Sequence, residues 1–418
     1  MDINNKGDLT LRAEDYLFAL PEDEEEAVKI GLEYWFDSGN FTSFSDGLVN
    51  AAVSSGYNGR PDDRPAVCQY ILHAADKAGI PLEKEKRNIQ NWLNEKNPPS
   101  RNLAGRDTIF RICFALNMNL PTVKSFFRKV YWERPFNFRD ISECVYYYCF
   151  QHGYSYVHAK EILKKVELEQ KGKSSEEFTR MIPEKIDAFL SEEEDDKLVQ
   201  YLAQHYESFQ IKEKTATQKI EALLKECKKC VDDLFDQFPE TYKLDGIVGH
   251  FLPDNEDEDY DKKNRLKGNE KLLNFIYGIP SRTFDEHGNY IKKSVENDIS
   301  GAFPLNYARS NLPSPAQLKS ILNGTVKISD SIRKALILLD FFQFSANNML
   351  NCGGTDHSFN DFYDDFEAEI NSILNECGFP EIYLRNPYDW LFYYCASRDD
   401  PLSALREMLT IENRVINE

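Results

Sequence analysis

Two short stretches bring together residue types that could bind a metal ion or attack a substrate. Cys227 and Cys230 form a C-x-x-C pair, but a zinc site needs about four ligands and no second Cys or His pair lies at a matching spacing. Cys352 and His357 share one Gly-containing loop, where an imidazole could lower the pKa of a thiol. Because such crowding is common in polar loops, we predict no metal site and no catalytic residue.

Motifs that hold phosphates or activate a serine are missing from the sequence. It contains no G-x-x-x-x-G-K-[ST], no G-x-G-x-x-G and no G-x-S-x-G, the signatures of P-loops, dinucleotide sites and serine hydrolases. The acidic run at residues 254–261 lacks the Gly and the final Glu of a calcium loop. We therefore expect a protein that is not an enzyme and needs no cofactor, with an unfamiliar helical active site as the alternative.

The composition is that of a globular protein. The chain has 418 residues, of which 41% are hydrophobic, and it includes 22 Tyr and 28 Phe. No apolar run approaches the ~18 residues of a membrane span, and the first residues (MDINNKGDLTLRAEDY) lack the basic start and apolar centre of a signal peptide. Nine Cys, an odd number, favour reduced thiols over disulfides. We expect a cytoplasmic protein with no membrane contact.

Charge is distributed unevenly along the chain. The net charge of -20 repels nucleic acid and anionic membranes at long range. Residues 81–140 nevertheless hold twelve Lys/Arg and six Asp/Glu, a balance of +6, whereas residues 351–418 hold four Arg and fourteen acids, a balance of −10. Any contact with nucleic acid must therefore use the first of these regions.

Helical periodicity runs through most of the chain. Apolar residues at steps of three and four define one face of a long helix: Ile220, Leu223, Leu224, Cys227, Val231 and Leu234. The same steps recur at Ile109, Ile112, Cys113 and Leu116, and at Leu336, Leu339 and Phe342. The best strand signal is a small hairpin in residues 282–294, with its turn at EHGN. The sequence therefore predicts an all-α fold.

An internal repeat is the most informative feature of the sequence. RDISECVYYYC at 139–149 aligns without a gap to RNPYDWLFYYC at 385–395, at an offset of 246, and both continue to a Glu and a Leu (Glu161 and Leu163, Glu407 and Leu409). Upstream, residues 106–114 match 333–341 at an offset of 227, and 89–94 match 318–323 at 229. The change in offset places a loop insertion at residues 343–364. Chance similarity between amphipathic helices is the alternative.

The repeat divides the chain into three parts. We predict an N-terminal helical module at 1–164, a helical, acidic connector at 165–269, and a diverged copy of the module at 270–418. Acids near the start of each Tyr-Tyr-Cys helix, such as Glu143 and Asp389, suit the positive end of a helix. We expect them to pair with the nearby Arg139 or Arg385.

A series of short helices and turns precedes the first Tyr-Tyr-Cys helix. In chain order it comprises AGIP at 78–81, a helix predicted for residues 82–96 with Trp92 and Leu93 near its end, PPS at 98–100, a helix from 106 to 116, and a Leu/Phe-rich segment at 120–127. This order resembles the Cro/Xre-type helix-turn-helix domain of bacterial and phage regulators. The Gly usual after the Trp-Leu pair is Glu95 here, whereas the second copy keeps Gly324.

The resemblance implies which side chains would contact double-stranded DNA. Residues 82–96 become the recognition helix, and five of its polar side chains could enter a major groove: Lys84, Lys86, Arg87, Gln90 and Asn91. Six further side chains are expected near phosphates: Lys96, Ser100, Arg101, Lys124, Arg128 and Lys129. The matching helix of the second copy is polar and nearly uncharged, so that copy is expected to be structural or to form a homo-dimer.

Two functions remain open from the sequence. In the first, the chain is a nucleic-acid-binding regulator that uses the helix-turn-helix-like unit. In the second, it is an acidic interaction or scaffold factor, of the kind found in mobile elements, phage defence or anti-defence, and it binds a basic protein. Helix-turn-helix geometry is also a compact way to pack three helices, so the sequence does not separate the two functions.

Overall fold

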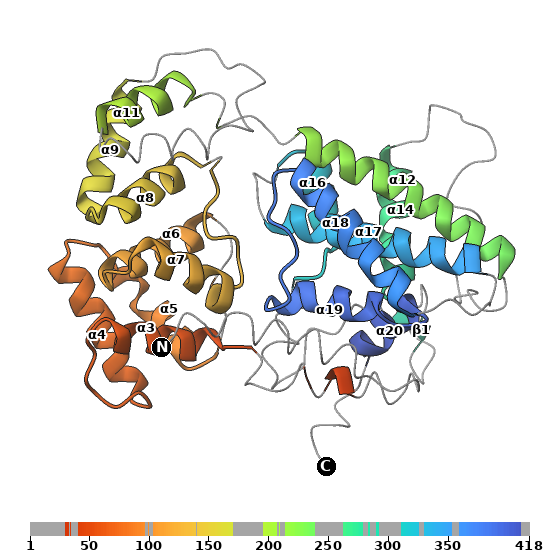
Figure 1. Ribbon diagram of the computed structural model, residues 1–418, viewed down its shortest axis with the longest axis horizontal. Coiled ribbons are helices and arrows are strands. Elements are labelled where there is room, and N and C mark those ends of the chain that lie inside the picture. Colours follow the sequence, from red (N-terminus) through yellow and green to blue (C-terminus); the bar gives the residue numbers. More distant parts are fainter. Residues whose placement is uncertain are drawn as a thin grey trace. The chain divides into compact units, whose positions relative to one another are not determined.

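A computed structural model gives the fold of the chain (Figure 1). It describes residues 30–32, 34, 41–96, 99, 103–138, 140–169, 195–206, 209, 214–238, 262–278, 283–284, 290–291, 311–325, 330–352 and 359–410. The chain forms two compact units. The first unit is Thr42–Lys212, and the second unit combines Met1–Phe41 with Glu213–Glu418.

Short helices joined by tight turns build the first unit. They are α3 (Phe44–Ser54), α4 (Arg64–Lys77), the 3-10 turn η2 (Glu83–Glu85), α5 (Lys86–Leu93), α6 (Leu103–Ala115), α7 (Leu120–Phe126), the π turn η3 (Phe127–Tyr131), α8 (Ile141–His152), α9 (Tyr156–Leu168) and α11 (Asp195–Gln204). Ser43, Asn119 and Ser155 cap α3, α7 and α9 by accepting hydrogen bonds from backbone N–H groups, which fixes where each helix begins.

Longer helices build the second unit. They are α12 (Lys214–Gln237), α14 (Lys262–Ile276), α16 (Pro315–Leu322), α17 (Asp330–Cys352), α18 (Phe359–Glu376), α19 (Pro387–Ala396) and α20 (Pro401–Thr410), with strands β1 (Thr283–Phe284) and β2 (Tyr290–Ile291). Helix α12 packs along α17, and α18 and α19 also pack against α17 (Figure 1). The central helix α17 therefore organises this unit.

The fold class predicted from the sequence is confirmed, because helices make up nearly all of the regular structure among the described residues. The small hairpin is also confirmed: Thr283 pairs with Ile291 and Phe284 with Tyr290 in antiparallel register. The predicted apolar faces are buried as well. Ile220, Cys227 and Leu234 of α12 are fully inaccessible to solvent, with a relative exposure of 0%.

The predicted loop at residues 343–364 is wrong for most of its length. Helix α17 continues to Cys352 and α18 begins at Phe359. Phe344 and Ala346 are buried, and the hydroxyl of Ser345 donates to the carbonyl oxygen of Phe341 one turn earlier. A serine inside a helix can satisfy its hydroxyl by donating to the carbonyl oxygen four residues earlier. The polar composition of this segment is therefore compatible with a helix, and the prediction of a loop was wrong.

The N-terminal segment (residues 30–41) belongs to the second unit, and the middle of the chain is shared between the two units. Tyr34 stacks on Trp390 of α19, with ring centroids 4.9 Å apart, and Leu32 and Phe41 are each only 3% exposed. The two compact units are bounded at 41/42 and 212/213, whereas the predicted division of the chain is at 164/165 and 269/270. The division into module, connector and second copy stays a prediction.

Candidate nucleic-acid interface

The helix pair α4–α5 is positioned by its own turn residues and by α6. Gly79 has a φ of 68° just after α4, a conformation that glycine adopts without steric cost. The guanidinium of Arg111 in α6 then donates from Nη1 to the carbonyl oxygen of Pro81 at 2.7 Å. Asp107 holds the same guanidinium, with its Oδ2 3.0 Å from Nε of Arg111. The turn that leads into α5 is thus anchored to the long helix behind it.

One face of α5 is anchored in the core. Ile89, Trp92 and Leu93 are buried, and the ring of Trp92 meets Phe44 of α3 edge-on at 5.8 Å. The hydroxyl of Ser45 donates to the carbonyl oxygen of Leu93 at 2.7 Å and so satisfies a carbonyl at the end of the helix. These contacts fix the rotation of α5 about its own axis.

The opposite face of α5 and of the turn before it carries a polar stripe: Lys84, Arg87, Asn88 and Asn91. The first three side chains are exposed and Asn91 is half-buried. Their spacing of three and four residues places them on one side of a helix. Because α5 is fixed by the core contacts on its other side, the stripe faces solvent.

Asn88 is a stripe residue that the sequence reasoning missed. The signal was the spacing of Asn88, which lies four residues after Lys84 and three residues before Asn91. This spacing places Asn88 on the same side of the helix as those two residues. Lys86 and Gln90, by contrast, are half-buried beside the stripe. The Nζ of Lys86 lies 3.5 Å from Oε1 of Glu83, and the side-chain amide of Asn88 donates to Glu85 at 2.8 Å. Such exposed pairs are weak and leave the stripe available to a ligand.

The helix predicted for residues 82–96 is shorter in the structure. Instead of one helix over residues 82–96, the chain forms the 3-10 turn η2 and then α5, which ends at Leu93. Leu82 is buried before the turn, and Glu95 has a φ of 55°. A left-handed residue ends a helix, so Lys96 lies beyond the helix as an exposed side chain.

The predicted phosphate-contacting residues are scattered over several environments. Ser100 and Arg101 lie outside the described residues. Arg128 is exposed and Lys129 half-buried at the π turn. Lys124 packs on α8 instead, with its Nζ 5.1 Å from the centre of the Tyr147 ring. The structure therefore places Lys84, Arg87 and Lys96 in solvent and gives Lys124 an intramolecular contact.

One of the twelve cations in residues 81–140 is buried inside the first unit and paired with a carboxylate. Arg106 is only 6% exposed, and it donates from Nε and Nη2 to the two oxygens of Glu143 at 2.7 Å each. Its Nη2 also donates to the carbonyl oxygen of Arg134 at 3.1 Å. This arginine is therefore not part of the surface charge of the region, because it ties α6 to α8.

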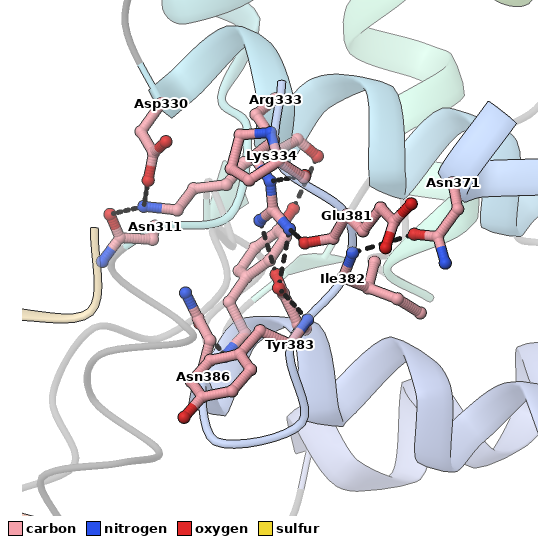
Figure 2. Close-up of polar contacts among 12 residues, drawn as sticks. Asn311, Asp330, Arg333, Lys334, Asn371, Glu381, Ile382, Tyr383 and Asn386 are labelled. Atoms are coloured by element: carbon pink, nitrogen blue, oxygen red, sulfur yellow. Dashed lines mark hydrogen bonds and ion pairs between the residues drawn. The ribbon is translucent and has the colours of Figure 1, made fainter. Parts of the chain in front are cut away.

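The second unit contains the same arrangement (Figure 2). Arg333 donates from Nη1 and Nη2 to the two oxygens of Asp389 at 2.7 Å each. It also donates to the carbonyl oxygens of Pro380 and Glu381, and Asp389 accepts from the backbone N–H of Tyr383. A buried charge needs this many partners. Beside it, Lys334 donates to Asn311 at 2.9 Å (Figure 2).

The prediction that Asp389 pairs with Arg385 was wrong, because Asp389 pairs with Arg333. Glu143 pairs with Arg106, and its predicted partner, Arg139, lies outside the described residues. Pairing with a distant arginine lets each carboxylate also accept a loop N–H: that of Asn137 at 2.6 Å in the first unit and that of Tyr383 at 2.9 Å in the second.

Three helices of the first unit and three of the second unit begin at positions that are separated by the same offsets as the aligned sequence blocks. Helices α5 and α16 start 229 residues apart and both have 8 residues, α6 and α17 start 227 apart, and α8 and α19 start 246 apart. Glu95 and Gly324, 229 apart, both have a left-handed backbone, with φ of 55° and 61°. These correspondences agree with the predicted repeat, whose origin by duplication stays a prediction.

The C-x-x-C pair has the surroundings of core thiols. Cys227 is 0% exposed, its thiol donates to the carbonyl oxygen of Leu339 at 3.3 Å, and burial raises its pKa well above the usual range. Burial also raises the pKa of Cys230, to about 11. Residues 353–358 of the Cys352–His357 loop lie outside the described residues. Among the described residues, no group of three or more His, Cys, Asp or Glu could hold a metal ion.

Two further observations bear on the type of protein. None of the described helices is long and apolar enough to cross a membrane. Comparisons of the chain with protein-family models, with curated proteins and with solved structures found no match. The functional argument therefore depends on the geometry of the chain itself.

Proposed function

We propose that this chain is a nucleic-acid-binding regulatory protein that contacts double-stranded DNA through α5 and the turn before it. The observation that carries the proposal is the outward stripe of Lys84, Arg87, Asn88 and Asn91 on a helix whose opposite face is fixed in the core. A rigid helix with one polar, cationic face is the element that enters a major groove.

Each stripe residue has a chemically defined task in this proposal. The guanidinium of Arg87 would donate to the O6 and N7 acceptors of guanine, and the amides of Asn88 and Asn91 would pair with adenine. Lys84 and the exposed Lys96 would contact phosphates. Because the net charge is -20, the rest of the chain opposes binding, so affinity depends on this one face and falls steeply with salt.

The two units differ at the helix that would contact DNA in this proposal. On α16, which corresponds to α5, the exposed side chains at the positions of Arg87 and Asn88 are Ala316 and Gln317. Gln317 already forms the capping box of its helix with Ser314. This helix has no cation at the positions of Lys86 and Arg87, although it carries the exposed Lys319 in its last turn. In our proposal the second unit is therefore a structural or dimerising partner rather than a second reader.

The test is a binding measurement with a matched charge control. A pool of random-sequence duplexes is selected on the full chain, and fluorescence anisotropy follows the enriched duplex against salt. We expect the double variant Lys84→Ala/Arg87→Ala to weaken binding about tenfold or more, since a bidentate contact is worth about 1–3 kcal/mol. The control Lys160→Ala/Lys164→Ala removes the same charge from exposed positions on α9 and should bind nearly as well as the unchanged chain.

Equal losses in the two variants would show that net charge alone matters and would contradict the proposal, as would failure of the selection to enrich any duplex.

A second candidate function, binding of a basic protein, is favoured by α18. Asp365, Glu369 and Glu376 are exposed and follow each other at helical spacing along one side. Retention of the chain on immobilised polylysine at low salt tests this candidate. If Asp365→Asn/Glu369→Gln/Glu376→Gln is retained as strongly as the unchanged chain, α18 is not the binding face.

A further inference from the structure

A series of polar contacts runs from α8 through α6 to the turn that precedes η2 and α5. In α8, the hydroxyl of Tyr146 donates to Oδ1 of Asp107 in α6 at 2.7 Å. The other oxygen of Asp107, Oδ2, lies 3.0 Å from Nε of Arg111 one helical turn later. Arg111 then donates from Nη1 to the carbonyl oxygen of Pro81 at 2.7 Å. These four residues are the Arg111 network.

The guanidinium of Arg111 is held by contacts on several of its nitrogens. Besides the contacts with Asp107 and Pro81, its Nη2 donates to the hydroxyl of Thr108 at 2.9 Å, and the side chain is only 14% exposed. An arginine whose planar fork is fixed presents its donors in one direction. Helix α6 itself is held by four side chains of 0% exposure: Ile109, Phe110, Ile112 and Cys113. The position of the Pro81 carbonyl is therefore set by α6.

The carbonyl that Arg111 holds lies directly before the residues of the polar stripe. Pro81 precedes Leu82, whose side chain is buried and whose carbonyl oxygen accepts from the N–H of Glu85 at 2.9 Å in η2. Lys84 and Arg87 follow three and six residues after Pro81. A shift of this carbonyl therefore changes where η2 and α5 begin and how the stripe is oriented.

The start of α5 has no side-chain cap of its own. Among the described residues, neither Leu82 before η2 nor Glu85 before α5 makes a capping hydrogen bond with its side chain. By contrast, α3, α4 and α7 of the same unit each begin with a capping side chain. Because a cap fixes where a helix begins, we infer that the bond from Arg111 to the preceding turn takes over this task for η2 and α5.

The second unit has other residue types at the positions of the Arg111 network. At the offsets of 227 and 246 they are Lys334 for Asp107, Leu338 for Arg111 and Phe392 for Tyr146. Leu338 and Phe392 are apolar and 0% exposed, so they pack in the core and donate no hydrogen bond from their side chains. Helix α16, which corresponds to α5, begins with a capping box instead. The network therefore occurs in the unit that carries the cationic stripe, and the other unit uses a local cap.

We propose that Arg111 is a positioning residue that lets the stripe on α5 discriminate between DNA sequences. This inference rests on the proposed function, because the orientation of the stripe matters only if the stripe contacts DNA. Hydrogen bonds to base edges weaken steeply when their distance or angle changes, whereas a flexible lysine side chain can follow a displaced phosphate. Loss of Arg111 therefore lowers sequence discrimination far more than it lowers affinity for DNA of any sequence.

Hydrogen exchange of the full chain without DNA tests the anchor itself. Arg111→Met keeps a long side chain at this position and removes its donors. We expect peptides that cover residues 82–93 to exchange about threefold to tenfold faster in this variant, because a hydrogen bond from a charged donor is lost. Peptides of α12 should not change. Lys160→Met, which removes one charge from an exposed position on α9, is the matched control and should leave the exchange of residues 82–93 unchanged.

Fluorescence anisotropy then compares the duplex enriched by selection with a scrambled duplex of the same length and composition. We expect Arg111→Met to lower the ratio of the two affinities about tenfold, the size of one lost base contact, and to change affinity for the scrambled duplex less than about twofold. The salt dependence of binding should stay the same, since no phosphate contact is removed. Asp107→Asn and Tyr146→Phe, which alter the network farther from Pro81, should cause smaller losses of the same kind.

The proposal is overturned if Arg111→Met discriminates between the two duplexes as well as the unchanged chain does, or if it loses the same factor with both. A thermal melt of each variant checks that the first unit is folded, and the milder Asp107→Asn decides the question if Arg111→Met is not. If the selection enriches no duplex, the proposed function fails and the role in discrimination fails with it. The hydrogen-exchange result then still shows whether Arg111 anchors the turn before α5.

Discussion

Two buried arginine–carboxylate pairs are the main polar contacts in the cores of the two units. Arg106 with Glu143 and Arg333 with Asp389 each form two hydrogen bonds of 2.7 Å, and all four side chains are nearly inaccessible to solvent. Desolvation of two charges offsets much of their attraction. Their measurable effect therefore appears when one partner is removed and the other is left buried and unpaired.

Replacing one partner should be far more harmful than replacing both. We expect Glu143→Ala to lower the free energy of unfolding by about 3–5 kcal/mol, because it leaves the charged Arg106 guanidinium buried without its carboxylate partner. The double variant Arg106→Met/Glu143→Leu removes both charges and should cost clearly less. Urea unfolding followed by circular dichroism measures both values. If the double variant is as unstable as the single one, packing rather than charge governs this site.

Asp340 is a further buried acid, and its raised pKa makes the free energy of unfolding depend on pH. The residue is 1% exposed, and among the described residues neither of its carboxyl oxygens has a hydrogen-bond partner. Burial, with a smaller contribution from Glu369 and against the attraction of Lys219, raises its pKa from 3.8 to about 8. The folded state therefore holds this proton more tightly than the unfolded state. The stability it contributes is complete below pH 4 and is lost as the pH rises towards 8, at about 1.4 kcal/mol per unit.

The corresponding test compares melting temperatures between pH 5 and pH 9. Asp340→Asn should flatten the decline of the unchanged chain and should melt higher than it at pH 9. Glu381→Gln, at an exposed position of the same unit, serves as the control and should leave the decline in place. A decline that persists in Asp340→Asn would assign the pH dependence to other groups.

At the scale of elements, the ends of α5 and α16 offer a matched pair of substitutions. Glu95 has a φ of 55° after α5, where α16 is followed by Gly324 with a φ of 61°. A side chain in this conformation costs about 1 kcal/mol relative to glycine. Glu95→Gly should therefore raise the stability of the first unit by up to about 1 kcal/mol, and Gly324→Ala should lower that of the second by a similar amount.

Chemical denaturation with hydrogen exchange resolves the two effects, because the peptides of each unit are observed separately. Changes of the same sign in the two variants would contradict this account of the helix ends.

At the scale of the whole molecule, the N-terminal segment belongs to the same compact unit as the C-terminal half of the chain. Three described residues of this segment contact α19, which lies more than 340 residues later in the sequence: Gly31, Tyr34 and Phe41. The valine side chain of Gly31→Val has no space against the ring of Tyr394, so we expect this variant to detach the segment. Hydrogen exchange of α19 should then increase several-fold, whereas that of α6 in the first unit should not change. Unchanged protection of α19 would show that the segment does not stabilise the second unit.

The sequence alone determined the local features. The spacing of apolar residues predicted the buried face of α12, and the turn residues EHGN predicted the hairpin. The outward face of α5 was predicted in part, since Lys84 and Arg87 are exposed but Asn88 was missed. Such features depend on neighbours within a few residues, which the sequence displays directly.

Only the tertiary structure decided the pairings between distant residues. It gave Glu143 a partner 37 residues away, placed Lys124 on the Tyr147 ring, and assigned the N-terminal segment to the second unit. The sequence alone does not identify which of many oppositely charged residues a given charged side chain contacts. Which of them it meets depends on how buried helices pack, and therefore on the loss of water from surfaces that are far apart along the chain.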